Sequence, residues 1–253
     1  MPNQDNHAPL VEFREVSFAV DGGRPIIDGL SLRVEQGETL VLLGESGCGK
    51  TTTLRLVNRL LAPTSGKVMV EGKATTDWDV IRLRRRAGYV IQEAGLFPHF
   101  TVERNVALVP SLEHWDEARV RARVRELLSL VGLDAARFAE RYPRELSGGQ
   151  RQRVGVARAL AADPPLLLMD EPFGALDPLT RSSLQKEFAE LKARLGKTTI
   201  FVTHDVREAL LLGSRIALMD AGRIVLLETP EGFLRSENQL AKAYLETLRN
   251  DFV

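Results

Sequence analysis

One segment near the amino terminus constrains the possible folds more than any other. An apolar run at 39–43 is followed by the loop Gly44-Glu45-Ser46-Gly47-Cys48-Gly49-Lys50-Thr51 and then by a predicted helix over 50–61. The loop matches G-x-x-x-x-G-K-[ST], whose glycines let the backbone wrap a phosphate with its N–H groups pointing inward. Because the pattern requires a strand before it and a helix after it, we predict an α/β fold that binds a nucleotide.

The side chains of this loop have distinct expected tasks. Lys50 is expected to reach the β- and γ-phosphates of the nucleotide, the Thr51 hydroxyl to be a ligand of Mg²⁺, and Thr52 to add a phosphate contact. The nucleotide-binding residues predicted from this segment are Gly44, Glu45, Ser46, Gly47, Cys48, Gly49, Lys50, Thr51 and Thr52.

Cys48 is the only cysteine of the sequence. No internal disulfide can form, which indicates a reducing compartment. Because a small side chain suffices at its place in the loop, we interpret Cys48 as a steric filler rather than a redox or metal-binding group.

Composition limits the classes of partner. The chain of 253 residues has 34 basic and 34 acidic residues, so it lacks the basic excess typical of proteins that bind nucleic acid. The basic runs at 82–86 and 119–125 are interpreted as solvated helix faces; docking of an acidic or lipid-proximal partner is the alternative. No apolar run approaches the ~20 residues that span a bilayer, and 1–10 lacks the apolar core of a signal peptide. At a membrane, other chains would supply the spanning helices.

The pattern along the chain predicts a sheet flanked by helices, interrupted by a helical segment. Strands are predicted at 11–20, 30–34, 39–43, 67–71 and 88–92. From 93 to 146 the strand signals vanish, and 116–131 is an amphipathic helix with apolar residues at helical spacing. Strands and helices then alternate, with strands at 166–170, 199–203, 215–220 and 223–227 and helices at 178–195 and 206–212. Alternation of this kind predicts a mostly parallel sheet.

Two carboxylates follow the apolar strand at 166–170. Asp170 and Glu171 are expected at the carboxyl edge of the sheet, where ligands bind in such folds. Asp170 is predicted to hold Mg²⁺, through water, and Glu171 to act as general base on the attacking water or to orient it. The alternative is an ordinary Asp-Glu pair on the surface after a buried strand. The presence of the phosphate loop disfavours this interpretation.

A second predicted phosphate site lies at Ser147-Gly148-Gly149. This step predicts a helix cap and a small anion nest before a helix that starts near Gln150. Since the chain already has one complete phosphate loop, the second nest is expected to serve the nucleotide of a neighbouring copy. The expected assembly is a head-to-tail dimer with two ATP molecules between the subunits, and Asp177 is expected at the same interface.

The ordered set GESGCGKTT, Gln92, LSGGQ, LLLMDE, GALD and His204 resembles the motif set of ATP-binding-cassette (ABC) ATPases, over residues 11–245. The resemblance implies a P-loop NTPase fold, an ABC-type nucleotide-binding domain with a mostly parallel core sheet, an antiparallel β subdomain and a helical subdomain. It further implies a core with β subdomain over 11–92 and 150–245, and a helical subdomain over 93–149 that carries the signature motif.

The same resemblance assigns further site residues. His204 looks like the family's switch histidine at the γ-phosphate, and Gln92 is expected to reach Mg²⁺ and the attacking water. Ser147, Gly148, Gly149 and Gln150 would contact the partner's ATP. An aromatic residue that stacks on adenine is usual just after the first strand; Val20 stands there, and Phe18, two residues earlier, is the expected substitute.

A closer resemblance concerns the role of the protein in the cell. Residues 88–110, 153–160 and 169–177 are similar to the ATPases of bacterial importers of quaternary amines such as glycine betaine, choline, carnitine or proline. This implies ATP hydrolysis that powers a membrane permease, an extracytoplasmic solute-binding protein beyond the permease, and a peripheral location on the cytoplasmic face of the inner membrane. Several such ATPases continue into paired regulatory domains, so that regulation is in doubt for a chain ending at Val253.

Other functions stay open at this point. An importer ATPase for another small solute, such as an amino acid or a sulfonate, shares much of the pattern. A soluble ABC ATPase that acts on DNA or ribosomes is disfavoured by the neutral charge, the short insert and the single cassette. A small-molecule kinase is disfavoured by LSGGQ and His204.

Overall fold

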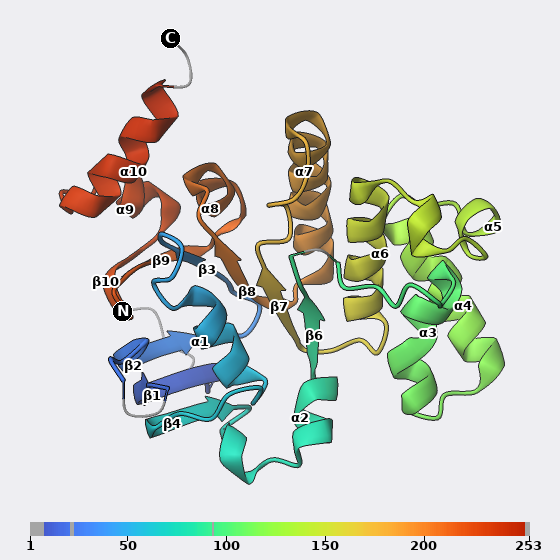
Figure 1. Cartoon of the computed structure of the whole chain (residues 1–253), viewed down its shortest axis with the longest axis horizontal. Helices are drawn as coiled ribbons and strands as arrows, with labels where there is room; N and C mark the ends of the chain where they lie inside the picture. Colours follow the sequence, from blue (N-terminus) through green and yellow to red (C-terminus); the bar gives the residue numbers. More distant parts are fainter. Residues whose placement is uncertain (1–7, 21–22, 93, 251–253) are drawn as a thin grey trace, which may run out of the picture. The chain divides into compact units, whose positions relative to one another are not determined.

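A computed structural model describes residues 8–20, 23–92 and 94–250 (Figure 1). The chain forms two compact units, one made of the residues up to Arg84 together with those from Lys197, the other of Arg85–Gly196. Each unit is described by itself. The predicted α/β class is confirmed, whereas the predicted subdomain boundaries at 93 and 149 stay a prediction.

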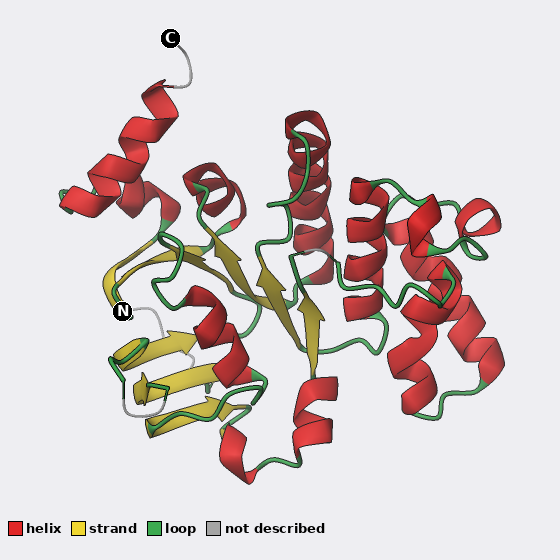
Figure 2. Ribbon diagram, viewed as in Figure 1, coloured by secondary structure: helices red, strands yellow, loops and turns green. Residues whose placement is uncertain are grey.

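The first unit contains an antiparallel sheet with the strand order β2-β1-β4-β5 (Figure 2). Its strands are β1 (Val11–Phe18), β2 (Ile27–Val34), β4 (Ser65–Val70) and β5 (Lys73–Ala74). Buried and exposed side chains alternate along most of β2, as expected for a sheet with one solvated face. Strand β1 was predicted to reach Val20, but it ends at Phe18, whose carbonyl accepts a hydrogen bond from Ile26 N–H at 2.8 Å. The sequence Asp21-Gly22-Gly23-Arg24-Pro25 is typical of a turn, and its first two residues lie outside the described residues.

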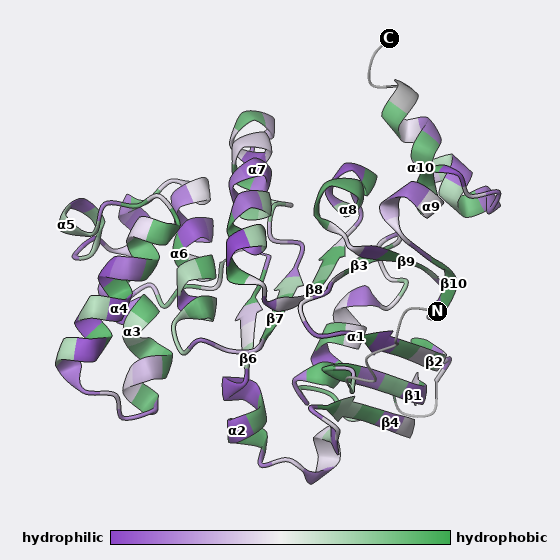
Figure 3. Cartoon of the chain, turned by 180° about the vertical axis from the view of Figure 1, so that it is seen from behind, coloured by the Kyte–Doolittle hydropathy of each residue, from purple (hydrophilic) through white to green (hydrophobic). Residues whose placement is uncertain are grey.

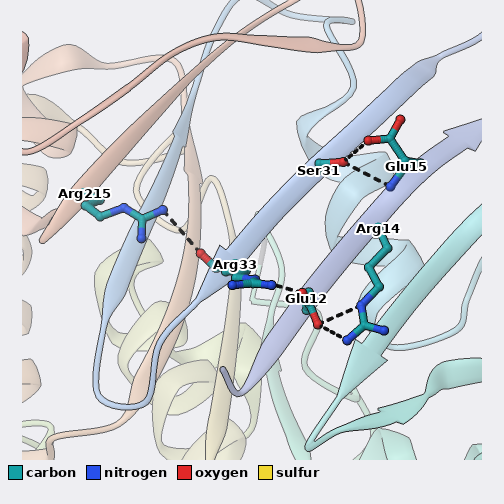
Figure 4. Close-up of polar contacts among 6 residues, drawn as sticks. All are labelled: Glu12, Arg14, Glu15, Ser31, Arg33 and Arg215. Atoms are coloured by element: carbon teal, nitrogen blue, oxygen red, sulfur yellow. Dashed lines mark hydrogen bonds and ion pairs between the residues drawn. The ribbon is translucent and has the colours of Figure 1, made fainter. Parts of the chain in front are cut away.

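A polar network ties β1 to its neighbours on one face of this sheet (Figure 4). The buried Glu12 carboxylate accepts hydrogen bonds from Arg14 Nη2 at 2.6 Å and from Arg33 Nε at 2.8 Å. These guanidinium groups, the Arg14 hydrogen bond foremost, lower the pKa of Glu12. Arg215 Nη2 in turn donates to the Arg33 carbonyl at 3.3 Å. The network joins the antiparallel sheet to β9 (Arg215–Asp220) by charge-assisted hydrogen bonds.

The same unit contains the strand that leads into the phosphate loop. Strand β3 (Thr39–Leu43) lies between β8 (Thr198–Thr203) and β9 (Arg215–Asp220), parallel to both, and β10 (Arg223–Glu228) pairs antiparallel with β9. Every residue of β3 and β8 is buried, as expected for strands covered on both faces. The helices of this unit are α1 (Lys50–Val57), η1 (Thr75–Asp77), α8 (Val206–Leu212), α9 (Pro230–Leu234) and α10 (Gln239–Asn250); α2 (Val80–Arg85) ends at the boundary with the second unit.

Helix α1 is shorter than predicted. It ends at Val57 instead of continuing to Leu61. The reason is Arg59, whose φ of 52° lies in the left-handed region that ends a helix. The N–H groups of Leu60 and Leu61 then turn back to the Arg55 carbonyl at 2.9 and 3.0 Å.

The second unit combines two parallel strands with a group of helices. Strands β6 (Ala87–Val90) and β7 (Leu166–Asp170) pair in parallel. The helices are α3 (Val102–Leu112), α4 (Glu117–Leu130), α5 (Ala135–Phe138), η2 (Pro143–Glu145), α6 (Gly148–Leu160) and α7 (Pro178–Leu195). Within the described residues from 94 to 146 there is no strand, which confirms the predicted helical segment.

Helix α4 matches the amphipathic pattern closely. Asp116 caps it by accepting from Arg119 N–H at 2.8 Å, and Val120, Val124, Leu127 and Leu128 form its buried face. Figure 3 shows hydrophilic and hydrophobic residues mixed along this helix. Ion pairs link its arginines to nearby acids, for example Arg121 to Glu117 and Arg123 to Glu126; the choice between a solvated and a docking face stays a prediction. Among the described residues, no helix is long and apolar enough to cross a membrane.

Candidate functional site

The predicted site residues are divided between the two units. The phosphate loop, Phe18, Val20 and His204 belong to the first unit, and Gln92, the segment 147–150, Asp170, Glu171 and Asp177 belong to the second. Each set is described in its own unit.

The phosphate loop is held in a backbone conformation that depends on glycine. Gly47 and Gly49 have φ values of 84° and 107°, which favour glycine. A Cβ atom at Gly44 would lie 2.5 Å from the Met219 carbonyl oxygen, so no larger residue fits there. Gly222 N–H donates to the Cys48 carbonyl at 3.1 Å and fixes the loop to the turn between β9 and β10. These contacts fix the backbone conformation of the loop.

Lys50 places a positive charge inside this loop. Its buried Nζ donates to the carbonyl oxygens of Gly44 and Glu45, each at 2.7 Å. Since the first turn of α1 holds no acidic residue, the helix N-terminus and the ammonium group both favour an anion at this place. Thr51 and Thr52 lie half-buried in the first turn of the helix.

Cys48 is buried against the loop, and burial raises the pKa of its thiol. A thiol that resists ionisation is a poor nucleophile and metal ligand. The environment of Cys48 therefore favours its predicted role as a steric filler.

His204 leaves the sheet beside the phosphate loop. Leu43 of β3 lies opposite Thr203 of β8. Gly44 and His204, the next residue on each strand, therefore leave the sheet side by side. The Thr203 hydroxyl donates to the buried Glu208 carboxylate at 2.6 Å and accepts from Asp205 N–H at 3.0 Å. These bonds hold the exposed His204 between β8 and α8.

The two candidates for stacking on adenine differ in exposure. Phe18 is 9% exposed and pairs with Ile27 inside the antiparallel sheet, whereas Val20 is 57% exposed beyond the end of β1. A strand over 11–20 would place both residues on one face, but β1 ends at Phe18, so Val20 does not continue it. Which residue contacts the base stays a prediction.

In the second unit, the ends of β6 and β7 carry the other predicted polar residues. Val90 lies opposite Met169, so Gln92 and Glu171 both lie two residues beyond one paired position. Asp170 is 9% exposed and accepts from the Tyr89 hydroxyl at 3.3 Å. Strand β6 was predicted to run to Gln92 but ends at Val90.

Glu171 and Gln92 come together at Gly174. A Cβ atom at Gly174 would lie 3.4 Å from Gln92 Nε2 and 3.5 Å from Glu171 Oε2. Glu171 itself has a φ of 44°, a conformation rarely adopted outside glycine and often found at functional sites. The Gly174 N–H donates to the Glu171 carbonyl at 3.1 Å and closes this turn. The side chains of the predicted base and the predicted glutamine therefore both lie beside Gly174.

Arg158 is a site residue that the sequence analysis missed. Its Nη1 and Nη2 donate to the carbonyls of Gly95 and Ala94 at 2.8 and 2.7 Å, so α6 holds the loop that follows Gln92. Ala94 is buried at a φ of 59°, and Gly155 of α6 lies so close that its Cβ would be 3.2 Å from Ala94 Cβ. Burial lowers the pKa of Arg158. No local signal marks this contact, because more than 60 residues separate its partners.

The segment 147–150 forms a capped helix start. Ser147 Oγ accepts from Gln150 N–H at 3.3 Å, and Gln150 Oε1 accepts from Ser147 N–H at 2.9 Å, a capping box. Helix α6 therefore begins at Gly148, earlier than the start predicted near Gln150. A Cβ at Gly149 would lie 2.6 Å from Thr180 Cγ2, so close packing requires glycine there. The first-turn N–H groups at Gly148 and Gly149 lack intrahelical acceptors by geometry.

Asp177 has a structural role in addition to its predicted one. Its carboxylate caps α7 by accepting from Thr180 N–H at 3.1 Å, and this hydrogen bonding lowers its pKa. The side chain is exposed. Its predicted place at a dimer interface stays a prediction.

Comparison with known proteins identifies the family. Residues 27–174 match the family described as "ABC transporter". The chain belongs to this family. It is 52% identical to the osmoprotectant import ATP-binding protein OsmV of Salmonella typhimurium (strain LT2), over 86% of this chain and 57% of OsmV. It is 50% identical to the choline transport ATP-binding protein OpuBA of Bacillus subtilis (strain 168), over 90% of this chain and 59% of OpuBA. The chain thus spans less than two thirds of the length of these relatives.

A solved structure shows the same fold. The dimeric, ADP- and Pi-bound post-hydrolysis state of the ATP-binding cassette MJ0796 has 33% identity and a TM-score of 0.77, over 87% of this chain and 98% of that one. The ABC-type fold expected from the sequence is confirmed.

The donor groups of the cassette fit Mg²⁺. The predicted ligands are the Thr51 hydroxyl, the Asp170 carboxylate and the Gln92 amide, all of which offer the oxygen atoms that Mg²⁺ prefers. Within the described part of the chain, no group of three or more His, Cys, Asp or Glu residues could hold a metal alone.

Proposed function

We propose that this cassette hydrolyses ATP to power a membrane permease that imports a quaternary-amine osmoprotectant such as glycine betaine or choline. The observation that carries the proposal is the 52% identity to an osmoprotectant import ATP-binding protein over 86% of the chain. The choline transport protein at 50% identity points to the same class of solute. Neither of these two relatives is named as an amino-acid importer.

The proposed mechanism assigns each cluster a step. The phosphate loop binds the β- and γ-phosphates, and Lys50, whose Nζ lies beside the Gly44 and Glu45 carbonyls, contacts the phosphate oxygens. Mg²⁺, held by Thr51, Asp170 and Gln92, would neutralise phosphate charge. Glu171 accepts a proton from the attacking water or orients that water. Gln92, whose amide also lies beside Gly174, positions the same water. His204 contacts the γ-phosphate and registers its loss.

We infer that ATP is bound between two copies of the chain. In that dimer the first-turn N–H groups at 148 and 149, with Ser147 and Gln150, face the partner's nucleotide, and Asp177 lies in the interface. The capping box supports this because it fixes the first turn of α6 while leaving its N–H groups directed outward. A dimeric cassette with 33% identity supports it as well.

The partners follow from this proposal. A permease would supply the membrane-spanning segments, an extracytoplasmic binding protein would deliver the solute, and the cassette would lie on the cytoplasmic face of the inner membrane. No nucleic-acid partner is expected of a chain with equal numbers of basic and acidic residues.

A pull-down from detergent-solubilised native membranes tests the proposal. The tagged chain should recover a multi-span permease and an extracytoplasmic binding protein. Titration of that binding protein with glycine betaine and choline should then give saturable binding, with sulfate and neutral amino acids as controls. Recovery of soluble or ribosomal partners alone would contradict import, and binding of a control solute alone would contradict the substrate class.

A further inference from the structure

The turn between β8 and α8 contains a buried carboxylate that the proposed mechanism does not use. Glu208 lies in the first turn of α8, is 4% exposed, and accepts from the Thr203 hydroxyl at 2.6 Å. Thr203, at the end of β8, is buried as well. A carboxylate this deeply buried is uncommon and needs hydrogen bonds or charges that satisfy it. Its position shortly after His204 in the chain allows an effect on that residue.

The Thr203 hydroxyl connects this carboxylate to the backbone beside His204. Thr203 Oγ1 donates to Glu208 and accepts from Asp205 N–H at 3.0 Å. A hydroxyl has one proton and two lone pairs, so a proton that points to Glu208 leaves a lone pair facing the Asp205 N–H. Each of the two hydrogen bonds also polarises the hydroxyl and strengthens the other. The carboxylate therefore fixes the orientation in which the hydroxyl holds this N–H group.

The arrangement is a capping box with a hydroxyl inserted in it. Asp205 is the N-cap of α8 and accepts from Arg207 N–H at 2.7 Å. In an ordinary capping box, the glutamate in the first turn accepts directly from the N–H group of the cap residue. Glu208 occupies that position but reaches the Asp205 N–H through the Thr203 hydroxyl. Since Thr203 belongs to β8, the inserted hydroxyl ties the start of the helix to the end of the strand.

The peptide groups on both sides of His204 are held in this way. The preceding one belongs to the end of β8, where Thr203 pairs with Leu43 of β3. The following one contains the Asp205 N–H, which the Thr203 hydroxyl holds. The backbone of His204 is thereby fixed between β8 and α8, which sets the direction in which its side chain leaves the chain.

We propose that Glu208 is a positioning residue for His204 in ATP hydrolysis. Through the Thr203 hydroxyl it fixes the backbone that presents the imidazole to the γ-phosphate. The inference rests on the proposed contact of His204 with that phosphate. Because a small displacement of a reacting or contacting group slows a reaction steeply, the effect belongs to kcat rather than to KM.

A double-mutant cycle on the full chain tests the proposal. Glu208→Ala should lower kcat by about 10–100-fold, the size expected of a misplaced group, with KM for ATP nearly unchanged. In a His204→Ala background the same exchange should cause no further loss, because the side chain that it positions is gone. Glu12→Ala is the control, since it removes a buried carboxylate from β1 of the same unit. It should lower stability but keep kcat in the folded fraction.

Conservative variants separate the hydrogen bonds from the packing. Glu208→Gln keeps an acceptor for the hydroxyl and should retain kcat within about threefold. Thr203→Val should reproduce the loss of kcat, and Thr203→Ser should not. Hydrogen exchange of the Asp205 amide in the nucleotide-free protein gives a readout without ATPase activity. Glu208→Ala and Thr203→Val should speed this exchange, whereas Glu208→Gln should leave it slow.

The results that contradict this inference differ from those that contradict the proposed function. Equal kcat losses from Glu208→Ala with and without His204 would overturn the positioning role, and so would an unchanged exchange rate of the Asp205 amide. An unaltered kcat in His204→Ala alone would refute the proposed role of His204, and the inference would fall with it. If Glu208→Ala does not fold, Thr203→Val and Thr203→Ser provide the same cycle.

Discussion

At the scale of single residues, Glu171 combines an unusual backbone conformation with a catalytic assignment. A φ of 44° costs free energy in a residue with a side chain, and here it directs the carboxylate toward the point shared with Gln92. The sequence analysis predicted the base from its position after a buried strand. It could not predict the left-handed conformation, which depends on the turn closed at Gly174.

Glu171→Gln should separate ATP binding from hydrolysis. We expect kcat to fall by about 10²–10⁴-fold, the usual contribution of a general base, with ATP affinity kept. Phosphate release and nucleotide titration measure the two quantities. Glu231→Gln, an exposed exchange of the same kind on α9, should leave both unchanged. Hydrolysis near the rate of the unaltered chain would remove Glu171 from the role of base.

Val20 offers a direct test of the adenine contact. It is 57% exposed just beyond β1, where the family usually has an aromatic residue. Val20→Tyr should therefore tighten ATP binding by about fivefold or more, since stacking on a base contributes ~1–3 kcal/mol. Val225→Tyr, at an exposed valine of β10, is the matched control. Equal ATP affinity in both variants would place the base elsewhere.

At the scale of elements, the predictions succeeded where the signal was local. Strand β7, helix α7 and helix α8 have the predicted bounds, because an apolar run or a cap marks each end. Helix α1 and strand β1 end early, because Arg59 adopts a left-handed conformation and the Phe18 carbonyl accepts from Ile26 N–H, and neither feature is marked in the hydrophobic pattern. Contacts such as that of Arg158 with the loop after Gln92 join distant segments, and no periodicity reports them.

The two hydrogen bonds that Arg158 of α6 donates to the loop after Gln92 can be tested by substitution. Arg158→Ala leaves two carbonyls without their donors and should lower the free energy of unfolding by about 1–3 kcal/mol. kcat should fall more than KM rises, because Gln92 lies two residues before Ala94. Arg158→Lys should restore the function only partly, since an ammonium cannot reproduce the fork of a guanidinium.

Denaturant unfolding and steady-state ATPase assays measure the effects of Arg158→Ala on stability and on kcat. Arg125→Ala, at an exposed arginine on α4, is the control. If Arg158→Ala lowers stability but leaves kcat intact in the folded fraction, the residue only supports the fold.

Tyr244 of helix α10 makes the stability of the folded chain depend on pH. Burial, with the nearby Cys48, Glu45 and Asp220, raises the pKa of Tyr244 to about 12. Because an unfolded tyrosine ionises near pH ~10, the folded chain keeps a proton that the unfolded chain loses. Stability should be full below pH ~10 and fall between about 10 and 12. Urea unfolding of the unaltered chain and of Tyr244→Phe should diverge in that window, and parallel curves would contradict the assignment.

At the scale of the whole molecule, the predicted site residues fall into two compact units. The first supplies the phosphate loop and His204, and the second supplies the carboxylates, Gln92 and the capped start of α6. The motif order alone indicated the family, which the comparisons confirm. The solute was inferred by resemblance, because the cassette itself carries no contact with it that a sequence could reveal.

The most direct test of this account is the molar mass of Glu171→Gln under light scattering with millimolar ATP and Mg²⁺. If the α6 cap of one copy completes the nucleotide site of another, the variant should shift to twice its monomer mass with ATP and remain monomeric with ADP. A Ser147→Arg exchange in the same background should prevent the shift. A variant that binds ATP yet stays monomeric would contradict the shared site.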